Sequence, residues 1–170
     1  MKKIIAGFLA LFALHTHAAL PDGAPAPNFT TQASLAGNAF DYSLSDALKK
    51  GPVVLYFYPA AFTAGCTIEA HNFAEAVDDF KALGATVIGV SKDSIDILKR
   101  FSVSECRGKF AVAADADQKI TKAYDAVLAV KPEYANRISY AISLKQQVYC
   151  SHAFRDSNQY ANRQFFRRAK

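Results

Sequence analysis

Continuous apolar runs that alternate with amphipathic stretches are the feature that most limits the fold of this 170-residue chain. Residues 52–58 (PVVLYFY), 85–91 (ATVIGVS) and 110–115 (FAVAAD) form runs typical of strands that are buried on both faces. Residues 66–83 and 94–103, which lie between them, space their apolar side chains as an amphipathic helix does. Strands that alternate with helices in this way predict an α/β fold with mostly parallel strands.

The segments outside this region extend the predicted α/β layer at both ends. The further predicted elements are a strand at 28–33, a hairpin at 36–44, a helical turn at 45–51, a short helix at 115–126, a strand pair at 137–144 and 147–154, and a closing helix from residue 156. A terminal hairpin and a final helix are what a thioredoxin-like fold adds. We therefore expect a thioredoxin-like α/β fold, with helices flanking a central mixed sheet and a short N-terminal β extension.

Residues 1–18 have the layout of a secretory signal peptide. Two lysines precede an apolar run at 4–14, and Thr16 and Ala18 occupy the −3 and −1 positions of a cleavage site after Ala18. The alternative is a membrane anchor, but this run is far shorter than the roughly 20 residues that span a bilayer. We predict an exported, periplasmic protein with no membrane attachment after cleavage, whose single domain covers residues 19–170.

The formal net charge of +5 does not predict a nucleic-acid partner. Charges of both signs are interspersed along most of the chain, and basic residues gather only in the final stretch, NRQFFRRAK. Cations in the last turn of a helix complement its dipole, which explains that cluster without a ligand. An exported protein also rarely meets nucleic acid.

The chain has three cysteines, Cys66, Cys106 and Cys150, too few for a disulfide-rich scaffold. Export would place them where disulfides form. An odd number leaves at least one cysteine unpaired within a monomer. Either one pair forms, or a thiol is kept free for chemistry.

Cys66 lies in the stretch YPAAFTAGCTIEAH, after a predicted buried strand and at the start of a predicted helix. The first N–H groups of a helix lack partners and carry partial positive charge, so they stabilise a thiolate, the reactive form. Gly65 permits close backbone approach, Thr63 places a hydroxyl near the sulfur, and Pro59 fixes the direction in which the chain leaves the strand. The alternative is that Cys66 is a small buried apolar residue, as free cysteines usually are.

The segment YFYPAAFTAGCTIEAHNF resembles the active-site segment of the peroxiredoxins, since Pro59, Thr63 and Cys66 fall on that family's P-x-x-x-T-x-x-C motif. ATVIGVSKDS, AADADQKITKAYDA and RISYAIS resemble matching segments of the bacterioferritin comigratory protein (PrxQ) branch, and the resemblance covers residues 26–143. It implies that Cys66 is the peroxidatic cysteine, whose thiolate attacks a hydroperoxide and becomes a sulfenic acid.

The resemblance also implies roles for the surrounding residues. Thr63 would hold the peroxide oxygens, and Arg137 would stabilise the thiolate and the negative charge that develops. Glu69 would position Arg137. Taken alone, Arg137 would be read as a solvated cation at a strand end, and Glu69 as part of an exposed helix face. The reductant would be a thioredoxin-like protein or a small thiol, and the branch suggests a monomer.

The chain departs from the PrxQ pattern at His71, where many members carry the cysteine that resolves the sulfenic acid. Three alternatives remain. We favour Cys106 as the resolving cysteine, through an intramolecular disulfide that requires local unwinding. The others are an external thiol and Cys150, whose place within a predicted strand suggests a structural thiol. A metal site at His71 and Cys66 is weakly supported, because zinc takes three or four protein ligands. We expect no metal and no cofactor.

Two other function classes fit the sequence less well. A thioredoxin-fold disulfide oxidoreductase uses C-x-x-C, but the residue three after Cys66 is Glu69. A non-enzymatic redox or metal-binding protein with a decayed site would not be expected to keep Pro59, Thr63, Cys66 and Arg137 together. The sequence therefore favours an exported thiol peroxidase.

Overall fold

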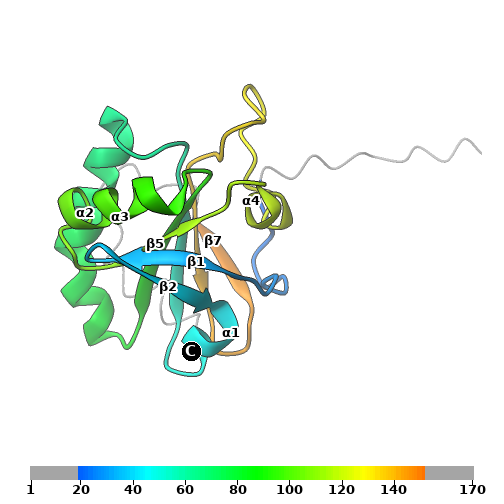
Figure 1. Cartoon of the computed structure of the whole chain (residues 1–170). Helices are drawn as coiled ribbons and strands as arrows, with labels where there is room; N and C mark the ends of the chain where they lie inside the picture. Colours follow the sequence, from blue (N-terminus) through cyan, green and yellow to red (C-terminus); the bar gives the residue numbers. More distant parts are fainter. Residues whose placement is uncertain (1–18, 152–170) are drawn as a thin grey trace, which may run out of the picture.

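The computed structural model of the chain describes residues 19–151 (Figure 1). The predicted signal peptide at 1–18 and the predicted closing helix from residue 156 lie outside the described residues. In the described part, no helix is both long enough and apolar enough to cross a membrane.

A seven-stranded mixed sheet in the order β2-β1-β5-β4-β3-β6-β7 forms the centre of the fold. The strands are β1 (Thr30–Leu35), β2 (Asn38–Ser43), β3 (Val53–Phe57), β4 (Thr86–Ser91), β5 (Ala111–Ala114), β6 (Ile138–Ile142) and β7 (Val148–Ser151). β4 pairs in parallel with both β3 and β5, but the other four pairings are antiparallel. The expected parallel pairing is found among the three buried strands β3, β4 and β5. The prediction of mostly parallel strands is wrong for the sheet as a whole, because the strands on either side of these three pair antiparallel.

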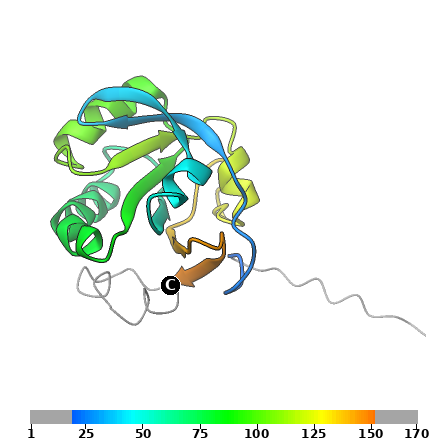
Figure 2. The same cartoon turned by 90° about the horizontal axis from the view of Figure 1, so that it is seen from below.

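Helices cover both faces of this sheet (Figure 2). They are α1 (Leu44–Leu48), α2 (Ala64–Ala82), α3 (Ile95–Ser104) and α4 (Lys119–Ala123). α2 and α3 pack on one face and α1 and α4 on the other, so each face buries its own apolar cluster. Side chains of β3 point alternately into the two clusters: Leu55 into that of α1 and α4, and Tyr56 into that of α2 and α3. This explains why the β3 sequence is apolar at every position.

The N-terminal β extension differs in detail from the prediction. We expected a strand at 28–33 and a separate hairpin at 36–44, but β1 and β2 together form a single hairpin. Its turn lies at Ala36 and Gly37, which have φ angles of 49° and 83°. Alanine rarely adopts a left-handed conformation, so its sequence gives no signal for the first turn position.

The sheet topology brings two distant segments to one edge. β3 and β6 are adjacent and antiparallel, and their register places Phe57, the last residue of β3, opposite Ile138, the first residue of β6. The loop that leaves β3 and the residue that precedes β6 therefore meet at the same end of the sheet. Cys66 comes shortly after the loop that leaves β3, and Arg137 is the residue directly before β6.

Candidate active site

Cys66 is the third residue of α2, and its side chain is buried, with 1% of the residue exposed. The helix begins after Thr63, which has an extended backbone and whose carbonyl accepts the first helical hydrogen bond, from Thr67 N at 2.9 Å. The sulfur thus lies in the first turn, where the backbone N–H groups are free and the helix dipole is positive. The predicted placement of Cys66 at a helix start agrees with this geometry.

Arg137 joins Cys66 to Glu69. Its Nη2 donates to Cys66 Sγ at 3.2 Å, and its Nη1 donates to Glu69 Oε2. Glu69 lies one turn after Cys66 on the same helix face and is 9% exposed. The structure therefore brings together three residues that the sequence singled out, and it places Glu69 in the core-facing side of α2 and not on an exposed face.

The charges of this cluster depend on each other. Burial raises the pKa of the Glu69 carboxyl to about 7, although the neighbouring Arg137 acts in the opposite direction. Burial acts to lower the pKa of Arg137, but the interactions with Glu69 and Cys66 outweigh it and raise that pKa. The guanidinium is therefore a fixed positive charge beside the sulfur.

Gly65 leaves room for the Arg137 guanidinium beside Cys66. A Cβ added at residue 65 would lie 2.8 Å from Arg137 Nη2, which is closer than real side chains come. Any side chain at this position would push the guanidinium away from Cys66. The expected close approach at Gly65 is thus made by Arg137.

Thr63 and Pro59 border the site without touching the sulfur. Thr63 is exposed, and its hydroxyl donates to the Ala60 carbonyl at 3.1 Å. It makes no hydrogen bond to Cys66 within the described residues. Pro59 is half-buried in the loop between β3 and α2.

Asp93 is a residue that the sequence analysis missed. Its Oδ2 accepts from Ala61 N and from Ser91 Oγ, each at 2.7 Å. Ala61 lies in the loop between β3 and Cys66, so this carboxylate fixes the loop from the end of β4. The signal was present in the SKDS sequence, which places polar residues directly after a buried strand.

Cys106 is fully buried and packs in the same apolar cluster as Cys66, next to Tyr58. Both cysteines are free thiols. Burial raises the pKa of Cys106, and the nearby Glu105 raises it further. Cys106 is therefore a neutral thiol in this state. Cys150 lies in β7 opposite Tyr140, and its side chain is outside the described part of the structure.

Two ion pairs and one hydrogen-bonded histidine–carboxylate pair connect α2 to the segment that carries Cys106, and we call them the ion-pair ladder. They are His71 Nε2 with Glu105 Oε2 at 3.0 Å, Arg107 Nη1 with Glu75 Oε1 at 3.3 Å, and Lys109 Nζ with Asp78 Oδ2 at 3.8 Å. Alternate residues of the 105–109 segment thus bind successive turns of α2. Cys106 lies between the first two pairs, with its side chain turned inward. His71 is therefore bound to a carboxylate, and no group of three potential metal ligands occurs among residues 19–151.

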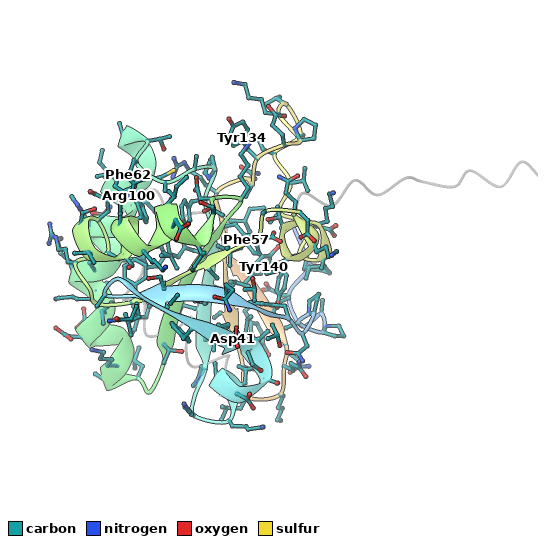
Figure 3. The ribbon with its side chains drawn as sticks, viewed as in Figure 1. Asp41, Phe57, Phe62, Arg100, Tyr134 and Tyr140 are labelled. Atoms are coloured by element: carbon teal, nitrogen blue, oxygen red, sulfur yellow. The ribbon has the colours of Figure 1, made fainter. Side chains whose placement is uncertain are left out.

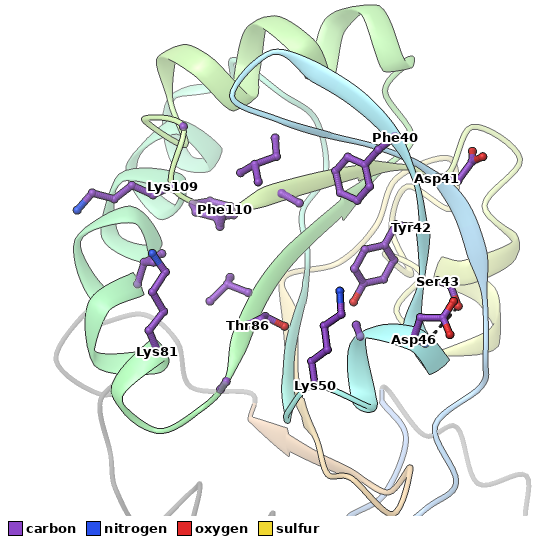
Figure 4. Close-up of a pocket in the computed structure, with 17 residues that line it drawn as sticks. Phe40, Asp41, Tyr42, Ser43, Asp46, Lys50, Lys81, Thr86, Lys109 and Phe110 are labelled. Carbon is purple, nitrogen blue, oxygen red and sulfur yellow. Dashed lines mark hydrogen bonds between the residues drawn. The ribbon is translucent and has the colours of Figure 1, made fainter.

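A cavity of about 720 Å³ lies away from this cluster (Figure 4). Its lining includes Val77 and Lys81 in the last turns of α2, together with Phe40, Tyr42 and Phe110. Cys66 begins the same helix, so roughly 20 Å of helix separates it from Lys81, at 1.5 Å per residue. This cavity does not contain the candidate active site.

The chain has a central mixed sheet with helices on both faces. It also has a buried cysteine at the start of a helix, and an arginine donates a hydrogen bond to that cysteine. These features define the thioredoxin-like class of thiol proteins. Residues 23–150 match the AhpC/TSA family. The chain belongs to this family, and its relatives include peroxiredoxins of the bacterioferritin comigratory protein and Q type. The resemblance inferred from the sequence is thus confirmed.

Two relatives show the extent of the sequence similarity. A putative peroxiredoxin bcp of Helicobacter pylori (strain J99) is 38% identical over 104 residues, which are 61% of this chain and 65% of that protein. The chloroplastic peroxiredoxin Q of Oryza sativa subsp. japonica is 39% identical over 100 residues, which are 59% of this chain and 44% of that protein. The similarity therefore spans less than two thirds of either relative.

Solved structures confirm the predicted thioredoxin-like fold. Peroxidoxin BcpB from Mycobacterium tuberculosis has a TM-score of 0.74 and 24% identity, covering 88% of this chain and 96% of that one. Thioredoxin peroxidase I from Plasmodium yoelii has a TM-score of 0.73 and 24% identity, with coverage of 86% and 87%. Because both structures are only 24% identical to this chain, the comparison shows the fold alone.

Proposed function

We propose that this protein is an exported thiol-dependent peroxidase that reduces hydrogen peroxide and organic hydroperoxides. The observation that carries the proposal is the 3.2 Å contact from Arg137 Nη2 to the sulfur of Cys66 in the first turn of α2. A fixed cation and a helix N-terminus both favour a thiolate. The peroxiredoxin relatives support the same reaction class.

The first step consumes one hydroperoxide. The Cys66 thiolate attacks the terminal oxygen, the O–O bond breaks, and the departing alkoxide or hydroxide leaves as alcohol or water after taking up a proton. Cys66 becomes a sulfenic acid. Arg137 stabilises the negative charge as it moves from sulfur to the leaving oxygen. Thr63 turns its hydroxyl toward the bound peroxide.

Cys106 then resolves the sulfenic acid. Its sulfur attacks Cys66 Sγ, the S–O bond breaks, water leaves, and an intramolecular disulfide forms. Two features support Cys106 over Cys150 and over an external thiol. Cys66 and Cys106 share one apolar cluster, and the ion-pair ladder holds their two segments together. A disulfide needs Cα atoms within about 7 Å, so the first turn of α2 or the segment around Cys106 unwinds to form it.

A thiol reductant closes the cycle by reducing this disulfide. The protein acts as a monomer in the periplasm after removal of residues 1–18. Protein recovered from the periplasm is then expected to begin at Ala19, which N-terminal sequencing measures.

Peroxide consumption by the purified protein with dithiothreitol tests the proposed activity. We expect rapid consumption by the parent and none above background by Cys66→Ser. Cys150→Ser serves as the matched control and is expected to retain the parent rate. If Cys66→Ser consumed peroxide as fast as the parent, the proposal would be wrong.

Disulfide mapping after one equivalent of peroxide tests the resolving residue. Mass spectrometry of the parent should find a peptide pair joined through Cys66 and Cys106. In Cys106→Ser we expect a persistent sulfenic acid on Cys66, trapped by dimedone. A sulfenic acid in the parent beside a free Cys106 would instead assign resolution to an external thiol.

A further inference from the structure

An exposed apolar patch with a basic border lies beside the loop that carries Cys66. A hollow of about 590 Å³ marks it. Phe62 and Val103, two of its lining residues, are 47% and 55% exposed. We call this surface the Phe62 patch, and its residues are Gly37, Phe62, Lys99, Arg100, Val103 and Ser104. Exposed apolar surface with a polar border is typical of an interaction site.

The Phe62 patch joins the two segments that lead to the reactive cysteines. Phe62 lies four residues before Cys66, in the loop between β3 and α2. Val103 and its neighbours lie in the last turns of α3, directly before Cys106. A protein that binds here would therefore touch both segments at once, and its thiol would lie near a disulfide between these cysteines.

Phe62 is held in an unfavourable backbone conformation. Its φ angle is 62°, in the left-handed region that bulky residues rarely adopt. Its ring packs edge-on against Phe101, with centroids 5.3 Å apart, and the Arg100 guanidinium lies 6.0 Å from the ring centre. Figure 3 shows Phe62 and Arg100 side by side at the edge of the molecule. The fold thus accepts backbone strain and presents an aromatic ring to solvent.

The border of the patch is basic. Arg100 makes no ion pair with any residue between 19 and 151, and Lys99 makes an exposed pair with Asp96 at 3.4 Å. An uncompensated guanidinium beside an apolar ring favours a partner with carboxylates around an apolar contact. The patch itself carries Lys99 and Arg100, and a second copy would bring the same cations to the contact, so charge favours an acidic partner over a second copy.

We propose that the Phe62 patch is the docking surface for the reductant, and that this reductant is an acidic protein dithiol with an apolar ridge beside its reactive cysteine. The proposal rests on the proposed function, because it requires the disulfide between Cys66 and Cys106. Phe62 and Val103 bind the apolar ridge, and Arg100 binds a carboxylate next to it.

The reaction at this surface is a thiol–disulfide exchange. A thiolate of the reductant attacks one sulfur of the disulfide, the S–S bond breaks, and a mixed disulfide forms while the other cysteine leaves as a thiolate and takes up a proton. The second thiol of the reductant then breaks the mixed disulfide. The reductant leaves oxidised, and both cysteines of this chain are thiols again.

The experiment compares two reductants on the same enzyme. Turnover is measured with a net-negative bacterial thioredoxin, kept reduced by thioredoxin reductase and NADPH, and separately with dithiothreitol, which needs no docking. The variants are Val103→Asp and Arg100→Glu. Their matched controls are Val130→Asp, at an apolar residue that is 83% exposed, and Lys122→Glu, at an exposed cation on α4.

We expect both patch variants to lower kcat/KM for thioredoxin by about tenfold or more, mainly through KM, because truncating or reversing central contacts weakens docking. Turnover with dithiothreitol, the rate of the peroxide step and the control variants should stay within about twofold of the parent. Added salt should slow the thioredoxin reaction of the parent more than that of Arg100→Glu.

Three results would overturn the docking proposal. The first is thioredoxin-linked turnover of the patch variants within about twofold of the parent. The second is a parent that thioredoxin does not reduce although dithiothreitol does. The third is a parent dimer in analytical ultracentrifugation that Val103→Asp dissociates, which would assign the patch to self-association. Failure of the parent with dithiothreitol would be a failure of the peroxidase function itself.

Discussion

Arg137 is the side chain that links the two other charged or reactive groups of the candidate site. Its planar guanidinium contacts Cys66 with one nitrogen and Glu69 with another. A single side chain therefore links the two residues and places a positive charge beside the sulfur. A lysine has one flexible ammonium and cannot make both contacts in fixed directions. Charge alone is therefore not enough at this position.

Arg137→Lys is expected to lower the second-order rate constant with hydrogen peroxide by about 10²-fold, the typical effect of removing one positioned donor. Stopped-flow measurement of the peroxide step reports this constant directly. Arg107→Lys is the matched control, because Arg107 lies outside the site, and it should react like the parent. Equal rates for Arg137→Lys and the parent would show that the two fixed contacts of the guanidinium are unimportant.

Glu69 makes the stability of the protein depend on pH. Burial raises its pKa in the folded protein from 4.5 to about 7, so the folded state holds a proton that the unfolded state releases. The free energy of unfolding that this group contributes is greatest below pH 4.5 and is lost as the pH rises to about 7. The charged form is tolerated there only because Arg137 pairs with it.

We expect Glu69→Gln to remove this pH dependence, because glutamine does not titrate. The free energy of unfolding, measured in urea at several pH values, should fall between pH 4.5 and 7 by more in the parent than in Glu69→Gln. Glu75→Gln, at an exposed carboxylate of the same helix, should behave like the parent. A parent that gained stability relative to Glu69→Gln over this range would contradict the assignment.

The residues of the site were predictable from the sequence to different degrees. Cys66 could be placed because a buried strand, a short loop and a helix start are all visible locally. The contact between Cys66 and Arg137, 71 residues apart, could come from the sequence only through family resemblance, because it depends on which strands are neighbours. The hydrogen bond of Thr63 to Ala60 and the bond of Asp93 to Ala61 depend on loop conformation, which has no periodic signal.

Among the elements, α2 and the segment after α3 form the moving parts of the proposed cycle. The ion-pair ladder holds them together, and Cys106 lies beneath it. The two exposed pairs, Arg107 with Glu75 and Lys109 with Asp78, contribute only about 0.2–1 kcal/mol each, so the ladder can open without unfolding the sheet. We therefore expect the ladder to restrict access to Cys106.

Removing two pairs with Glu75→Gln and Glu105→Gln should speed modification of Cys106 by a thiol reagent by up to about 30-fold, from the sum of two pairs of at most about 1 kcal/mol each. The measurement uses a Cys66→Ser, Cys150→Ser background, in which Cys106 is the one remaining cysteine. Asp46→Asn, which breaks the exposed pair with Lys49 elsewhere, is the control. An unchanged rate would mean that the ladder does not restrict Cys106.

The elements themselves were predicted well where burial determined the sequence. The runs at 52–58 and 85–91 became β3 and β4, because strands covered on both faces must be apolar throughout. The single N-terminal hairpin was not predicted, since its turn places Ala36 at a positive φ angle. The antiparallel pairings at both ends of the sheet also gave no local signal.

At the scale of the whole molecule, the sheet separates the apolar cluster that contains the candidate site from a second apolar cluster on its other face. Cys66 and Cys106 belong to the cluster of α2 and α3, whereas the opposite cluster holds Leu55, Phe57 and Tyr140 and contains no site residue. A loss of packing in the opposite cluster should therefore destabilise the protein without changing the reaction at Cys66.

Leu55→Ala tests this separation, because Leu55 is fully buried in the opposite cluster. We expect it to lower the free energy of unfolding by about 2–5 kcal/mol, as measured by urea denaturation. The rate of the peroxide step, measured well below the unfolding midpoint, should stay within about twofold of the parent. A large loss of rate in the folded variant would show that the two faces are coupled.

The antiparallel pairing of β3 with β6 determines when the candidate site can form during synthesis and folding. Cys66 is synthesised 71 residues before Arg137, and the two meet only when Ile138 aligns with Phe57. A chain that is still being synthesised carries Cys66 without its guanidinium. Until then, Cys66 lacks the contact that carries the proposed reaction with peroxide. Completion of the sheet therefore assembles the site on which the proposed activity depends.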